Sequence, residues 1–157
     1  MLDLKAHLKT LTEAHAPSGH EAPIRDLLRE TWRGLTDRLE QDKLGSLIGV
    51  KNATQPLDPP RRMMLAAHMD EIGLMVRGIV DGFITVHRIS GVDARLMLAQ
   101  PVIVHGRRAL PGVVASVPPH LLPASARGKY PGFDDLLIDV GLPADEVAQL
   151  VRIGDLI

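Results

Sequence analysis

Apolar residues near the N-terminus recur at helical spacing. Leu4, Leu8 and Leu11 fall at positions i, i+4 and i+7, so they lie on one face of a predicted helix. The sequence APSG, which begins at Ala16, then interrupts this pattern. A second helix is predicted after it, and its buried face consists of Ile24, Leu27, Leu28 and Trp32.

Ser18 and Glu21 mark the predicted start of this second helix. Their S-x-x-E spacing is that of a capping box, in which each side chain hydrogen-bonds a backbone N–H that the helix leaves unpaired. Pro23 follows closely, and proline is tolerated best in the first turn of a helix. We therefore expect the helix to begin just after Glu21.

Extended segments follow the two helices. Segments 39–42 and 46–51 form a predicted hairpin. Met63 to Ala67 is a continuous apolar run, which is typical of a strand buried on both faces in the middle of an α/β sheet. The length of the run is also compatible with a helix. We interpret it as an interior strand whose carboxyl end lies at His68.

From Ile72 onward the pattern is mainly that of β-strands. Segments 73–77 and 83–87 flank the dipeptide Asp81-Gly82, which is the usual sign of a tight hairpin. The later predicted elements are a hairpin of 101–105 with 112–115, a proline-rich loop at 118–132, a strand at 136–140 and a helix at 143–150. Because the last residues resemble the start of another strand, we expect the polypeptide to be cut rather than complete.

Composition narrows the class of protein. The chain has 157 residues, 45% of them apolar and 24% charged, which is typical of a soluble globular protein with one domain or two small ones. Its net charge of −1 gives no electrostatic reason to expect nucleic acid or an anionic membrane as a partner. No apolar stretch is long enough to cross a bilayer, and the amphipathic N-terminus does not resemble a signal peptide. The sequence has no cysteine, which excludes thiolate ligands and disulfides and fits a cytoplasmic location.

His68 and Asp70 are the strongest candidates for chemistry. Both follow the predicted interior strand at the carboxyl edge of the sheet, where open α/β folds bind their ligands. A neutral imidazole is the commonest protein ligand of transition metals, and a nearby carboxylate can accept its second ring N–H and fix the tautomer. The H-x-D pattern alone is common, so a purely structural role for His68 at a strand end is the alternative.

Several motifs, taken in order, resemble one family of peptidases. The sequence from Leu65 to Val76, LAAHMDEIGLMV, is similar to the first metal motif of the glutamyl and deblocking aminopeptidases, also called cellulase M-like or tetrahedral aminopeptidases. The resemblance extends over nearly the whole chain. The other similar segments are APSGHE (16–21), DKLGSLIG (42–49), GVDARLMLAQPVIVHG (91–106), PGVVASVPPHLL (111–122), FDDLLIDVGLPADE (133–146) and VRIGDLI (151–157).

The resemblance implies a specific chemistry. Enzymes of this family hydrolyse N-terminal residues from peptides with two divalent metal ions, usually zinc or cobalt, that share a bridging water or hydroxide. The metals lower the pKa of that water and polarise the scissile carbonyl group. His68 matches the family's first metal ligand, and Asp70 matches the carboxylate that orients it.

The family's remaining metal ligands have no counterpart in this sequence. They comprise a bridging Asp, a pair of Glu residues of which one is the general base, another Asp and a final His. Around His87, His105 and His120 the sequence shows no second ligand residue at metal-binding spacing, and one imidazole cannot hold two metals that each need roughly four to six donors. We therefore expect at most one weak partial site, and no turnover by this polypeptide alone.

The resemblance also implies a two-part α/β fold. Residues 1–69 correspond to the N-terminal part of a zinc-peptidase-like α/β catalytic domain, and residues 70–157 to a small Greek-key β-barrel, a PDZ-like lid that mediates dimerisation. An interior strand without its neighbours exposes apolar surface and backbone donors. We therefore expect homo-oligomerisation through the β domain, or association with a C-terminal half that carries the missing ligands.

Three hypotheses about function follow. The first is a metal-dependent aminopeptidase that acts on peptides, present here as a fragment. The second is a non-enzymatic oligomerisation or interaction module derived from that family, in which His68 is idle. The third, a glycan hydrolase, is disfavoured because sugar-binding surfaces use stacking aromatics, and the chain has one Trp, one Tyr and two Phe. A converging carboxylate pair is also missing, since the adjacent Asp70 and Glu71 point to opposite faces of an extended segment.

Overall fold

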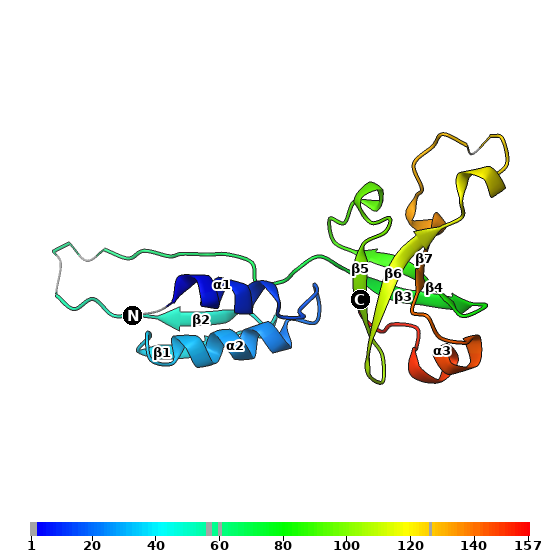
Figure 1. Ribbon diagram of the computed structural model, residues 1–157. Coiled ribbons are helices and arrows are strands. Elements are labelled where there is room, and N and C mark those ends of the chain that lie inside the picture. The colour runs from blue at the N-terminus through cyan, green and yellow to red at the C-terminus, as the bar shows by residue number, and fades with distance from the viewer. Residues whose placement is uncertain (1–2, 56–57, 60, 126) are drawn as a thin grey trace. The chain divides into compact units, whose positions relative to one another are not determined.

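The chain folds into two compact units. The structure, a computed structural model, describes residues 3–55, 58–59, 61–125 and 127–157. The N-terminal unit is Met1–Glu71 and the C-terminal unit is Ile72–Ile157. The first unit contains two α-helices and a hairpin, and the second contains a β-sheet and one short α-helix (Figure 1).

The N-terminal unit has the helices and the hairpin that the sequence predicts. The Asp3 carboxylate accepts a hydrogen bond from the Ala6 N–H and caps the first helix. Pro23 lies in the first turn of the second helix, as expected. The hairpin is antiparallel, and the Asp42 carboxylate stabilises its turn by accepting the N–H groups of Leu44 and Ser46. The elements are α1 (Leu4–Thr12), α2 (Ala22–Trp32), β1 (Arg38–Gln41) and β2 (Leu47–Val50).

Helix α2 packs against strand β2. A methyl group at Gly49 would lie 3.1 Å from Trp32 Cε3 and 2.9 Å from Thr36 Cγ2. The absence of a side chain at Gly49 therefore lets the indole approach the strand. Ile24, on the predicted apolar face of α2, is buried.

The predicted capping box at the start of α2 is wrong. Glu21 is the N-cap residue, yet no side chain caps the helix, and Glu21 Oε1 instead accepts the Gly19 N–H at 2.6 Å. The Ser18 hydroxyl donates to the carboxylate of Asp70. A hydrogen bond to an ionised carboxylate is stronger than one between a neutral hydroxyl and a backbone N–H, and Ser18 forms the bond to the carboxylate.

The predicted interior strand at Met63–Ala67 does not form in this chain, but its apolar side chains are exposed, as expected for an interior strand without its neighbours. The segment is extended, but it pairs with no strand in the described part of the chain. Met63, Met64 and Leu65 are 87%, 87% and 89% exposed. An apolar run can be buried on both faces only where strands flank it and layers cover it, and the described residues supply neither.

The C-terminal unit is built on a five-stranded sheet with the strand order β3-β4-β7-β6-β5. Every neighbouring pair in it is antiparallel. Its strands are β3 (Gly73–Val80), β4 (Phe83–Ile89), β5 (Pro101–His105), β6 (Ala109–Ser116) and β7 (Leu136–Asp139). Its helices are η1 (Ala94–Leu96), η2 (Pro119–Leu121), η3 (Phe133–Asp135) and α3 (Ala144–Leu150).

The predicted hairpins are confirmed, and their turn residues explain the connections. Asp81 and Gly82 join β3 to β4 with φ values of 51° and 86°. Positive φ at both central residues is the requirement of a tight type I′ turn, which Asp-Gly meets readily. The second hairpin has a shorter turn than predicted, because β6 already begins at Ala109.

Alternating positions of the strands form the core of the C-terminal unit. Residues two apart on one strand point to the same face of a sheet, so this face is apolar and buried. Val147, on α3, and Val151, just after it, are also buried in this core. The buried strand residues are Leu74 and Val76 on β3, Ile84 and Val86 on β4, Val104 on β5, Leu110 and Val114 on β6, and Leu136 and Ile138 on β7.

The last residues of the chain hydrogen-bond to both edge strands of this sheet. Leu156 forms antiparallel bridges with Met75 on β3 and with His105 on β5. The Leu74 and Ile157 backbones exchange two hydrogen bonds of 2.8 Å, and the His105 N–H donates to Leu156 O, also at 2.8 Å. Strands β3 and β5 stand at opposite ends of the strand order, and Leu156 links the backbones of both.

Candidate functional site

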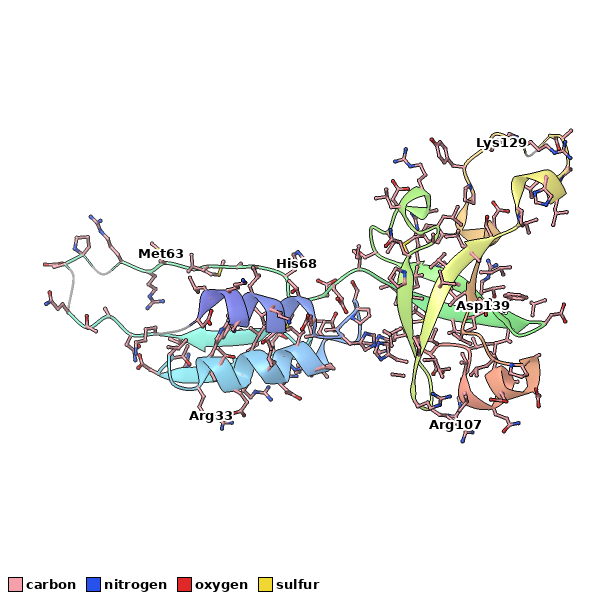
Figure 2. All side chains as sticks on the ribbon, viewed as in Figure 1. Arg33, Met63, His68, Arg107, Lys129 and Asp139 are labelled. Atoms are coloured by element: carbon pink, nitrogen blue, oxygen red, sulfur yellow. The ribbon has the colours of Figure 1, made fainter. Side chains whose placement is uncertain are left out.

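His68 presents one ring nitrogen to solvent and holds the other in hydrogen bonds. Its Nδ1 atom lies 3.0 Å from both the backbone oxygen and Oδ1 of Asp70. A carbonyl oxygen and an ionised carboxylate can only accept, so Nδ1 carries the proton in the neutral ring and Nε2 keeps its lone pair. The side chain is 85% exposed and belongs to the same extended segment as Met63 (Figure 2). The Nε2 lone pair is therefore not used by the contacts of Nδ1 and lies on an exposed ring.

The two carboxylate oxygens of Asp70 serve different partners. Oδ1 faces the His68 ring, and Oδ2 accepts the hydroxyl of Ser18. The hydrogen bond from Ser18, and next that from His68, hold the pKa of the Asp70 carboxyl below its usual value, against a smaller opposing effect of burial. Asp70 is therefore ionised at neutral pH, and its side chain is 29% exposed.

Glu71 clamps the preceding loop onto the same segment. Its Oε1 accepts the Ala16 N–H at 2.9 Å, and its own N–H donates to Ala16 O at 3.1 Å. Pro17 and Glu71 form a parallel bridge, and Ala16 and Pro17 are buried. His15 Nδ1 lies 3.8 Å from Glu71 Oε1, which gives an ion pair when the ring is protonated. Glu71 thus holds the Ala16 loop in place, whereas Asp70 contacts Ser18 and His68.

The donors present do not complete a metal centre. Within the described part of the chain, no group of three or more His, Cys, Asp or Glu side chains is placed to hold an ion. Structural and catalytic zinc sites use at least three protein ligands. His68 fits one such ligand and Asp70 fits its orienting partner, but the described residues alone do not fit the pair of divalent metals that the sequence resemblance implies.

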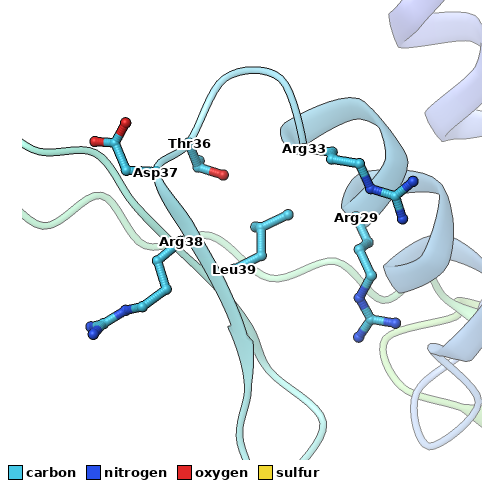
Figure 3. Close-up of a pocket in the computed structure, with 6 residues that line it drawn as sticks. All are labelled: Arg29, Arg33, Thr36, Asp37, Arg38 and Leu39. Atoms are coloured by element: carbon cyan, nitrogen blue, oxygen red, sulfur yellow. The ribbon is translucent and has the colours of Figure 1, made fainter.

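A shallow pocket of about 320 Å³ lies elsewhere in the N-terminal unit, between α2 and β1. Figure 3 shows Leu39 directed toward α2 and Arg38 directed away from it. The pocket is lined by Arg29, Arg33, Thr36, Asp37, Arg38 and Leu39. Its three arginines are already paired with the carboxylates of Asp26, Glu30 and Glu40. These ion pairs leave little net positive charge for an anionic ligand, and the pocket includes neither His68 nor Asp70.

Sequence patterns place His68 and Asp70 near each other but do not reveal their supports. Ser18 is 52 residues from Asp70, and its S-x-x-E spacing points to a helix cap instead. The clamp between Ala16 and Glu71 spans 55 residues. The APSG motif marks the loop but carries no information about the segment it contacts.

None of the helices in the described residues combines the length and hydrophobicity needed to span a bilayer.

Comparison with known proteins gives consistent matches. The chain is 36% identical over 155 residues to the lysyl aminopeptidase of Pyrococcus furiosus. This alignment covers 94% of this chain and 43% of that protein. A TET aminopeptidase from a marine sediment thaumarchaeon superimposes with a TM-score of 0.84 at 33% identity, over 97% of this chain and 43% of that one. The TET1 peptidase of Pyrococcus horikoshii, which can assemble into a tetrahedron or a large octahedral shell, gives a TM-score of 0.77 at 31% identity, over 97% of this chain and 45% of that one.

These matches cover nearly all of this chain but less than half of each relative. The chain therefore has the α/β fold of the N-terminal portion of such aminopeptidases. The family model for M42 glutamyl aminopeptidases matches residues 45–157, which include His68, Asp70 and the whole C-terminal unit. The chain belongs to the M42 glutamyl aminopeptidase family.

Proposed function

We propose that this chain carries the first metal ligand of a metal-dependent aminopeptidase, which removes N-terminal residues from peptides once the other donors are supplied. The observation that carries the proposal is the 3.0 Å contact between His68 Nδ1 and Asp70 Oδ1, which leaves Nε2 free on an exposed ring. In this proposal His68 is the ligand and Asp70 orients it. The lysyl aminopeptidase relative supports the reaction class.

The proposal includes the absence of activity in the isolated chain. One exposed imidazole supplies a single donor, whereas a transition metal requires roughly four. More than half of the Pyrococcus furiosus relative has no counterpart in this chain, which spans 43% of that protein. The missing donors belong, in this proposal, to a polypeptide that corresponds to the remaining part of the relatives.

The exposed segment at Met63–Ala67 supports the need for such a polypeptide. Its large apolar side chains, Met63, Met64 and Leu65, are exposed and lie three to five residues before the proposed ligand, His68. A strand with apolar residues on both faces gains stability only between neighbouring strands and covering layers. Strands of the completing polypeptide that flank this segment would also bring further donors next to His68.

The C-terminal unit, in this proposal, is a closed Greek-key barrel that serves as lid and assembly domain. The contacts of Leu156 with both β3 and β5 support closure, since a closed sheet leaves no unpaired edge. Assembly through this unit is supported by apolar side chains on its outer surface, such as Ile103 and Val113, which are 44% and 43% exposed. The TET1 relative, which forms large closed shells, supports a homo-oligomer.

Complementation tests the proposal directly. The chain is mixed with a recombinant polypeptide that corresponds to the unmatched C-terminal part of the Pyrococcus furiosus lysyl aminopeptidase, with zinc or cobalt, and hydrolysis of an aminoacyl anilide is followed. We expect hydrolysis only when both polypeptides and the metal are present. His68→Ala should abolish it, and His87→Ala, which removes an exposed histidine of β4, should leave it unchanged.

Association of the two polypeptides must be measured in the same samples by light scattering. A stable complex with bound metal and no hydrolysis would contradict the peptidase role. That result would favour the alternative, a non-enzymatic interaction module, for which the exposed apolar segment is the supporting observation. Equal hydrolysis by His68→Ala would contradict the assignment of His68 as a ligand.

A further inference from the structure

We infer that Ser18 is a positioning residue for His68, acting through Asp70. The Ser18 hydroxyl donates to Asp70 Oδ2, and the other carboxylate oxygen, Oδ1, lies 3.0 Å from His68 Nδ1. The three side chains thus form one line from the APSG loop to the exposed imidazole. The relevance of this line to metal binding rests on the proposed function, but its effect on the ring of His68 does not.

The carboxylate of Asp70 needs such a support because its terminal torsion is soft. Rotation about χ2 of an aspartate has broad minima, so one hydrogen bond to an exposed imidazole defines its plane poorly. A second bond, from Ser18 to the opposite oxygen, restricts that rotation. With the plane restricted, Oδ1 stays within hydrogen-bonding distance of Nδ1, and the proton of the neutral ring stays on that nitrogen.

Ser18 can act in this way because its own loop is held firmly. Ala16 and Pro17 are buried, and Glu71 binds both backbone groups of Ala16. The His20 N–H donates to Pro17 O at 2.8 Å and closes a turn around Ser18. The hydroxyl is therefore presented from a fixed backbone to a residue 52 positions later in the chain.

Helix capping does not account for the serine. Helix α2 starts at Ala22, its N-cap residue is Glu21, and no side chain caps it. The Gly19 N–H is taken by Glu21 at 2.6 Å. The hydrogen bond that the structure assigns to the Ser18 hydroxyl is the one to Asp70, which serves the candidate ligand.

The test is the tautomer of His68 in the metal-free chain. Two-bond ¹⁵N–¹H correlation spectra at about pH 8, above the usual pKa of histidine, separate a ring protonated at Nδ1 from one protonated at Nε2. The signals of His68 are assigned by their loss in His68→Gln. We expect the Nδ1-protonated form to dominate in the unsubstituted chain.

Three variants separate the hydroxyl from the loop. Ser18→Ala should lower the ratio of Nδ1- to Nε2-protonated ring by roughly 2- to 12-fold, the equivalent of one net hydrogen bond. The loss is partial because the backbone oxygen of Asp70 also lies 3.0 Å from Nδ1. Ser18→Thr keeps the hydroxyl and should restore the ratio. Glu21→Ala removes a hydrogen bond of the same loop without touching Asp70, and should leave the ratio unchanged.

Two results would overturn the inference. One is an unchanged ratio in Ser18→Ala. The other is an equal loss in Glu21→Ala, which would show that loop order rather than the hydroxyl acts on the ring. Neither metal nor a second polypeptide is present in this experiment, so its outcome is independent of whether complementation yields peptidase activity.

Discussion

Replacing Ile138 with alanine tests whether the C-terminal unit has a close-packed core of its own. Ile138 lies on β7, the middle strand of the sheet, and is 0% exposed. It pairs with Ile84 on one side and with Val114 on the other, so paired backbone surrounds it and leaves little freedom to collapse into a cavity. We therefore expect truncation at this site to cost both the lost apolar burial and nearly all of the cavity contribution.

The expected loss of stability follows from the atoms removed. Isoleucine to alanine deletes three carbons, which amounts to about 2.4 kcal/mol at about 0.8 kcal/mol for each buried methylene. The remaining cavity raises the total to about 3–4 kcal/mol, whereas Ile138→Val should cost about 1 kcal/mol. For a unit of this size, each kcal/mol corresponds to about 4–8 °C in the unfolding midpoint. We therefore expect a decrease of about 12–32 °C for alanine and of about 4–8 °C for valine.

Thermal unfolding followed by far-ultraviolet circular dichroism measures the loss of the β-sheet signal. Trp32, the only tryptophan of the sequence, lies in the N-terminal unit, so its fluorescence reports on that unit separately. Ile153→Ala, at a residue of the same unit that is 75% exposed, is the matched control and should change the midpoint little. If Ile138→Ala shifted the midpoint no further than Ile138→Val, the packing argument would be refuted.

Two further predictions concern the same unit. In Gly106→Ala the new methyl carbon would lie 2.3 Å from Leu150 O, so the backbone must shift. We expect this variant to lose about 1–3 kcal/mol of unfolding free energy, measured by denaturant unfolding. Gly91→Ala, which has open space around the new methyl group, is the control and should be nearly neutral. The guanidinium of Arg95, and next its backbone N–H, lower the pKa of Asp93 to about 2. The stability that this ionised carboxylate contributes is therefore complete above about pH 4 and is lost as the pH falls through about 2. Urea midpoints of the unsubstituted chain and of Asp93→Asn should therefore differ at neutral pH and converge in acid, and a constant difference down to pH 2 would contradict this assignment.

Local patterns were sufficient to predict most of the elements. Helical spacing at Leu4, Leu8 and Leu11 marks α1, and the Asp81-Gly82 dipeptide marks the turn between β3 and β4. Both signals act over a few residues, where backbone geometry depends on the nearest neighbours in the sequence. Such signals determine the type of an element well and say little about its contacts.

The contacts that define the candidate site are of a different kind. The bond from Ser18 to Asp70 and the clamp of Glu71 on Ala16 join segments more than 50 residues apart, so no spacing rule contains them. The serine was misread as a cap because its hydroxyl suits either acceptor or donor partners, and the long-range carboxylate is the one it binds. Likewise, the apolar run Met63–Ala67 shows that the segment before His68 is suited to burial. It does not show whether other residues are available to cover that segment.

In the proposed enzyme, Nε2 of His68 binds a metal together with donors from a completing polypeptide. The most direct measurement is the ¹⁵N signal of His68 Nε2 during titration with zinc, in the complex with the C-terminal part of the lysyl aminopeptidase and in the isolated chain. We expect this signal to shift, from that of a free lone pair to that of a coordinated nitrogen, in the complex at stoichiometric zinc, and not to shift in the isolated chain at the same concentration. Zinc-dependent peptide hydrolysis by the complex with the Nε2 signal unchanged would contradict it.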